Sequence, residues 1–110
     1  MSNLQLTEKQ KNIVISILRS NLVSQSISFA ELKILIFGSR TSKDKVKKFS
    51  DLDIAIIRKP LKLSILEIAT LIEQFAASDL PFKVDICNFE DLPDSIKSQI
   101  LEKNIELSIY

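Results

Sequence analysis

The feature that most constrains this chain is its single glycine, Gly38, among 110 residues. It directly follows the apolar run at residues 34–37 and precedes Ser39 and Arg40. Glycine makes up about 7% of an average protein. A chain that otherwise avoids glycine has kept one where the backbone must turn sharply or let a ligand approach closely. We therefore expect a functional site at the end of this apolar run.

Length and composition indicate one domain over residues 1–110, with a modest core. Hydrophobic residues make up 45% of the chain, which favours folding, and a net charge of +1 gives no strongly basic surface for nucleic acid or membranes. No apolar run reaches membrane-spanning length. The lone cysteine, Cys87, cannot form an internal disulfide, and the first residues lack a signal-peptide pattern. We therefore expect a cytoplasmic location.

The sequence contains no histidine. This excludes histidine-based triads, histidine general bases and histidine-ligated zinc. Any catalysis must therefore use carboxylates, hydroxyls, lysines or a hard metal ion held by oxygen atoms.

Hydrophobic periodicity predicts helices alternating with strands. Capping-box patterns at Thr7 with Gln10, and at Ser64 with Glu67, mark the starts of two helices. The predicted helices cover about residues 7–21, 63–78 and 93–103, and the predicted strands cover residues 30–37, 52–57, 82–87 and 105–110. This interleaving predicts an α/β layer structure.

Three aspartates lie in the predicted strands. Asp51 and Asp53 stand at the start of the second strand, where residues two apart share a face. Two neighbouring carboxylates retain a proton or bind a cation between them. Without histidine, the cation that suits these oxygen ligands is Mg²⁺ or Mn²⁺. Asp85 lies between Val84 and Ile86, where we expect it to be buried and to act as a third ligand or a general base.

The Gly38-Ser39 turn offers backbone N–H groups and a hydroxyl, which suit an anion such as phosphate. If the first two strands pair antiparallel, this turn and Asp51 lie at the same edge of the sheet. A phosphate site beside metal-binding carboxylates is the arrangement that phosphoryl or nucleotidyl transfer requires.

These segments together resemble the minimal nucleotidyltransferases (MNT) of the DNA polymerase beta-like superfamily. The resemblance is carried by Gly38-Ser39-Arg40, Ser50-Asp51-Leu52-Asp53 and Val84-Asp85-Ile86. It spans about residues 33–92 and is greatest to short prokaryotic MNT proteins encoded beside a helical HEPN-domain partner. It implies a polymerase beta-like α+β fold, in which helices pack on a small mixed sheet.

The resemblance also implies roles for individual residues. The residues that would bind the nucleoside triphosphate are Gly38, Ser39, Arg40 and Ser50. The residues that would bind the metal ion and catalyse transfer are Asp51, Asp53 and Asp85.

By the same resemblance, the protein is an antitoxin that transfers AMP from ATP, with Mg²⁺, to a tyrosine of a HEPN ribonuclease toxin. The partner is then a helical HEPN-domain toxin protein, rather than nucleic acid or a membrane. Relatives usually place a glycine shortly after Gly-Ser-Arg, and residues 41–44 contain none. A second hypothesis therefore stays open: an antitoxin that keeps the fold and neutralises its partner by binding alone. Aminoglycoside and tRNA nucleotidyltransferases are disfavoured, because they need extra domains to hold the acceptor.

Overall fold

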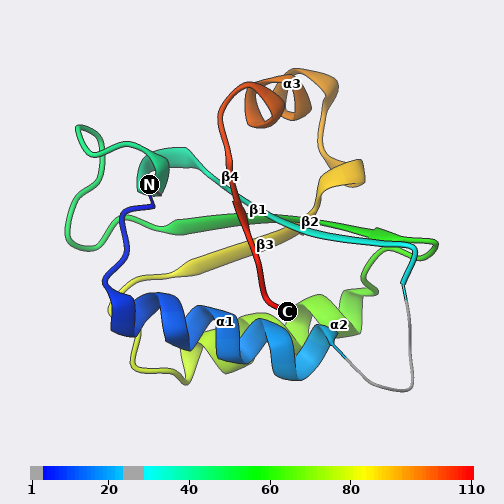
Figure 1. Ribbon diagram of the computed structural model, residues 1–110, viewed down its shortest axis with the longest axis horizontal. Helices are drawn as coiled ribbons and strands as arrows, with labels where there is room; N and C mark the ends of the chain where they lie inside the picture. Colours follow the sequence, from blue (N-terminus) through cyan, green and yellow to red (C-terminus); the bar gives the residue numbers. More distant parts are fainter. Residues whose placement is uncertain (1–3, 24–28) are drawn as a thin grey trace.

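Helices and strands alternate along the chain, as the periodicity predicts (Figure 1). The computed structural model describes residues 4–23 and 29–110. The elements are α1 (Glu8–Leu22), β1 (Glu31–Phe37), the short 3-10 helix η1 (Gly38–Thr41), β2 (Leu52–Lys59), α2 (Ile65–Ala76), β3 (Val84–Asn88), the 3-10 turn η2 (Phe89–Asp91), α3 (Asp94–Glu102) and β4 (Ile105–Leu107). Every predicted helix and strand is present, with small shifts at the ends.

Side-chain caps fix the starts of the two longer helices. Thr7 and Gln10 form a reciprocal capping box at α1, and Ser64 and Glu67 form a second one at α2. Each box satisfies two N–H groups that the first turn of a helix leaves without partners. Among the residues described, no helix combines the length and apolar character needed to cross a membrane.

The four strands form one mixed sheet in the order β3-β2-β1-β4. Strand β1 pairs antiparallel with β2 and with β4, whereas β2 and β3 run parallel. The end of β1 and the starts of β2 and β3 therefore meet at one end of the sheet, on the left in Figure 1. This arrangement confirms the predicted small mixed sheet with helices packed on it.

The two faces of the sheet are covered unequally. Helices α1 and α2 lie on one face, and α3 lies on the other (Figure 1). The main core includes Val14, Leu18, Ile34, Ile36, Leu52, Ile54, Leu71 and Phe75. The smaller cluster on the α3 face has Leu35, Ala55 and Ile100 as its buried members. Because side chains alternate along a strand, Asp53 lies on the α3 face, between two residues of the main core.

Candidate active site

Gly38 lies where β1 turns into η1, and its backbone requires a glycine. Its φ angle is 81°, in the left-handed region that other residues rarely adopt. A Cβ atom at this position would lie only 2.5 Å from Oδ2 of Asp53. The single glycine therefore allows both the sharp turn and the close approach of the turn to a carboxylate.

One hydroxyl and one backbone N–H close this turn. Oγ1 of Thr41 donates to the carbonyl of Gly38 at 2.6 Å, and the N–H of Ser42 donates to the carbonyl of Ser39 at 3.1 Å. In the part of the chain that the structure describes, the Ser39 hydroxyl has no hydrogen-bond partner of its own. It is therefore available to a ligand at the end of β1.

Asp53 is the central carboxylate of the site. It is the register partner of Phe37 in β1 and of Asp85 in β3, so the two carboxylates start on neighbouring strands. Partial burial raises the pKa of Asp53 to about 6, and the charges of Asp85 and Asp51 add to this rise. Electrostatic repulsion thus links all three predicted acids.

Asp85 is less buried than we expected from its apolar neighbours. Its side chain is 46% exposed, and a carboxylate oxygen lies 3.3 Å from Nζ of Lys83. Val84 and Ile86 turn to the main core, whereas Asp85 faces the α3 side on an edge strand of the sheet. The expected burial is therefore wrong, and the carboxylate is accessible from outside.

The acids fit a divalent cation by their chemistry. All their donors are carboxylate oxygens, and their mutual repulsion is the interaction that a bound cation would relieve. They do not yet form a closed set of ligands, since no three His, Cys, Asp or Glu side chains converge on a metal position among residues 4–23 and 29–110. Asp85 pairs with Lys83 in this arrangement.

Arg40 is buried and binds the backbone of two other segments. Its Nε and Nη2 atoms donate to the carbonyl of Ser50 at 3.0 and 2.8 Å. Nη1 donates to the carbonyl of Gln5 at 3.1 Å, and Nη2 also donates to that of Lys48 at 3.2 Å. The guanidinium carbon lies 4.1 Å from the ring centroid of Phe82. Arg40 therefore joins the η1 turn to the loop that leads into Asp51.

Ser50, like Arg40, forms hydrogen bonds within the chain. Its carbonyl accepts from Arg40, and its hydroxyl accepts from the N–H of Lys47 at 2.8 Å. We predicted that Arg40 and Ser50 contact the nucleotide. The structure gives both residues intramolecular partners that join the η1 turn to the loop before Asp51, and their contact with a nucleotide stays a prediction.

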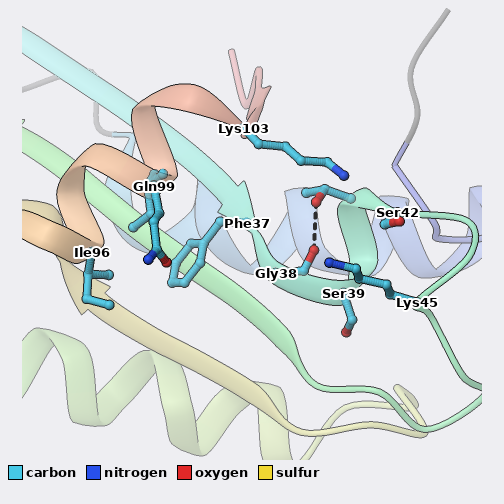
Figure 2. A pocket seen from close by; sticks show the side chains of 10 residues that line it. Phe37, Gly38, Ser39, Ser42, Lys45, Ile96, Gln99 and Lys103 are labelled. Atoms are coloured by element: carbon cyan, nitrogen blue, oxygen red, sulfur yellow. Dashed lines mark hydrogen bonds between the residues drawn. The ribbon is translucent and has the colours of Figure 1, made fainter.

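A cavity of about 380 Å³ opens beside Gly38 and Ser39, between η1 and α3 (Figure 2). This volume lies in the range of small-molecule sites. The residues that line it are Phe37, Gly38, Ser39, Thr41, Ser42, Lys45, Ile96, Gln99, Ile100 and Lys103.

The contribution of α3 to this cavity was not predicted from the sequence. Ile96 lies three residues before Gln99 and four before Ile100, which places these three on one face of the helix, and Lys103 follows the helix directly as its C-cap. Two of these four residues, Gln99 and Lys103, are polar, which indicates that this side of α3 has a role besides packing on the sheet.

Sequence comparison relates the chain to a known family. A family model described as "Polymerase beta, Nucleotidyltransferase" matches residues 14–109. A Haemophilus influenzae protein named "Probable protein adenylyltransferase MntA" is 42% identical over 79 residues, which cover 64% of this chain and 68% of the relative.

Solved structures share the fold at lower sequence identity. A toxin–antitoxin crystal structure with AMP-PNP has a TM-score of 0.65 and 23% identity, over 87% of this chain and 70% of that chain. The toxin–antitoxin MntA-HepT has a TM-score of 0.62 and 21% identity, over 91% of this chain and 70% of that chain. By its family match and its relative, the chain belongs to the polymerase beta nucleotidyltransferase family, as a minimal nucleotidyltransferase of that superfamily.

Proposed function

We propose that residues 1–110 form one minimal nucleotidyltransferase domain that acts as an antitoxin. It transfers AMP from ATP to a tyrosine of a helical HEPN-domain ribonuclease toxin in the cytoplasm, and so neutralises the toxin. The observation that carries this proposal is the meeting of the Gly38-Ser39 turn with three carboxylates at one end of the sheet. The relative named as a protein adenylyltransferase and the toxin–antitoxin structures of the same fold support it.

The carboxylates and the Gly38-Ser39 turn would have different tasks, the first binding a metal ion and the second the phosphates. Asp51, Asp53 and Asp85 would hold a divalent cation, Mg²⁺ or Mn²⁺, which when bound neutralises charge on the triphosphate. Gly38 and Ser39 bind the phosphates through backbone N–H groups and the Ser39 hydroxyl. Arg40 and Ser50 keep this turn in place relative to Asp51.

The exposure of Asp85 suits an acceptor that arrives on another protein. The phenol oxygen of the tyrosine attacks the α-phosphorus of ATP, the bond to the β-phosphate oxygen breaks, and pyrophosphate leaves. The phenol proton passes to the carboxylate of Asp85, which lies on an edge strand and is reachable from outside. Lys83 lies beside this carboxylate, with its Nζ atom 3.3 Å from a carboxylate oxygen.

Intact-mass spectrometry of the toxin tests the proposal. Incubation with the protein, ATP and Mg²⁺ should raise the mass of the toxin by one or more AMP units. The Asp53→Asn variant should leave the mass unchanged. Glu106→Gln on β4, which also turns an exposed carboxylate into an amide, should behave as the wild type.

Toxin inhibition separates this proposal from the alternative. An unmodified toxin that wild type and Asp53→Asn inhibit equally would contradict transfer, and would instead support an antitoxin that acts by binding alone.

A further inference from the structure

The cavity between η1 and α3 has two chemically different halves (Figure 2). Near Gly38, its lining carries the hydroxyls of Ser39 and Ser42 and the ammonium group of Lys45. The far half is lined by Phe37, Ile96 and Gln99, whose side chains lie together in Figure 2. One continuous cavity thus joins a phosphate-compatible half to an apolar half with one amide.

The apolar half is held in place by the smaller hydrophobic cluster. Phe37 and Ile96 pack against the buried residues Leu35, Ala55 and Ile100. An aromatic ring and a branched aliphatic side chain give a flat apolar lining, which suits the face of a planar heterocycle. The polar half alone would suit any phosphate, but this second half suits a ligand with a ring.

Gln99 is the one amide in this lining. Ile100, which is 2% exposed, anchors α3 on the sheet, so the helix presents Gln99 to the cavity. Its side-chain amide makes no hydrogen bond to any residue in the described part of the chain. The amide therefore offers an acceptor oxygen and N–H donors to a ligand.

We infer that the Phe37–Ile96–Gln99 half of the cavity is a base subsite, in which Gln99 selects adenine. This inference rests on the proposed function. A glutamine amide pairs with adenine by accepting from the N6 amino group and donating to N7. Guanine has the acceptors O6 and N7 on the same edge. The oxygen of the Gln99 amide would then face O6, which cannot donate a hydrogen bond to it. Discrimination thus arises because a mismatch leaves polar groups unpaired.

Calorimetric titration of the full chain with Mg²⁺ tests the inference. The probes are ATP, GTP, 7-deaza-ATP, which lacks the N7 acceptor, and inorganic tripolyphosphate, which lacks the base. Wild type should bind ATP about 5- to 150-fold more tightly than GTP, the range expected for one bidentate base contact. It should also bind ATP more tightly than 7-deaza-ATP.

Two variants of Gln99 sharpen the test. Gln99→Ala should lose most of the ATP preference and bind tripolyphosphate as the wild type does. Gln99→Glu keeps an acceptor for the N6 amino group but has no donor for N7, so it should bind ATP and 7-deaza-ATP equally. Glu102→Ala, on the same helix but outside the cavity lining, should retain every preference of the wild type.

The outcomes separate this inference from the proposed function. If tripolyphosphate and all nucleotides bind but Gln99→Ala changes no preference, the base subsite is overturned while the transferase proposal stands. If wild type binds neither ATP nor tripolyphosphate, both fail. Loss of the ATP preference in Glu102→Ala would also overturn the role given to Gln99.

Discussion

The two faces of one sheet differ in what their side chains do. Among the residues that the structure describes, the core between the sheet and helices α1 and α2 has sixteen buried hydrophobic members. In the same described ranges, the cluster between the sheet and α3 has three buried members, and the starts of β2 and β3, where Asp53 and Asp85 lie, stay open. Strand β2 serves both faces, because Leu52 and Ile54 enter the core while Asp53 turns to the site. Alternation along a strand therefore lets neighbouring residues serve stability and chemistry separately.

The difference also appears in the electrostatics. The main cluster consists of apolar side chains, whereas at the open end of the α3 face the charges of Asp85 and Asp51 repel the carboxylate of Asp53. Such repulsion costs stability, and natural proteins accept this cost at sites where function needs it. Changes on the α3 face should therefore reduce activity more than stability, and changes on the core face should do the reverse.

The largest effect is expected for Asp85→Asn on AMP transfer. Loss of a positioned general base typically lowers the rate by about 10²- to 10⁴-fold. Because the Asp85 side chain is 46% exposed, the free energy of unfolding should change little. Single-turnover transfer and urea denaturation measure the two effects. Full transfer activity in the variant would remove Asp85 from the mechanism.

The next effect is expected on the core face, for Leu71→Ala. Leu71 is 1% exposed in the main core, and this truncation should lower the free energy of unfolding by about 2–5 kcal/mol. Ile96→Ala, on the thinner α3 face, should cost only about 1 kcal/mol, because Ile96 is partly exposed. Urea denaturation checks both values. Equal losses would mean that the two faces contribute equally to stability.

A smaller effect is expected for Arg40→Lys, at the link between the turn and the carboxylates. Lysine retains the charge but cannot donate to three carbonyls in the planar geometry of a guanidinium. The free energy of unfolding should fall by about 2 kcal/mol, and ATP binding should weaken because the η1 turn loses its anchor. Lys47→Ala, an exposed change in the same loop, serves as the control and should stay within about 0.5 kcal/mol. Wild-type stability in Arg40→Lys would contradict the anchoring role.

Local patterns in the sequence predict most of the fold and part of the site. Capping boxes, apolar periodicity and the lone Gly38 are local signals, and the structure confirms the elements and the turn that they predict. The exposure of Asp85 depends on strand order, which places β3 at an edge and which no local pattern specifies.

Two other features also depend on distant segments. Arg40 finds its carbonyl partners at Gln5, Lys48 and Ser50, which the fold brings together from separate parts of the chain. Gln99 reaches the cavity because of the way α3 packs against the sheet. Tertiary contacts, rather than residue type, decide these positions.

The contrast between a stabilising core face and a functional α3 face is tested most directly by the contribution of Asp53 to the pH dependence of protein stability. The pKa of Asp53 is about 6 in the folded protein, against a reference value of 3.8. Between these values the folded state binds more protons than the unfolded state, so stability should fall as pH rises from about 4 to about 6. After allowance for solvent screening, the loss should be about 1 kcal/mol.

The measurement is urea denaturation of wild type and Asp53→Asn across this pH range, with AMP transfer measured on the same samples. The variant should lose the Asp53 contribution to the pH slope, exceed the wild type in stability by about 1 kcal/mol near pH 7, and transfer no AMP. A variant that is less stable than wild type at pH 7, keeps the full slope or retains transfer would contradict the view that Asp53 serves function at the expense of stability.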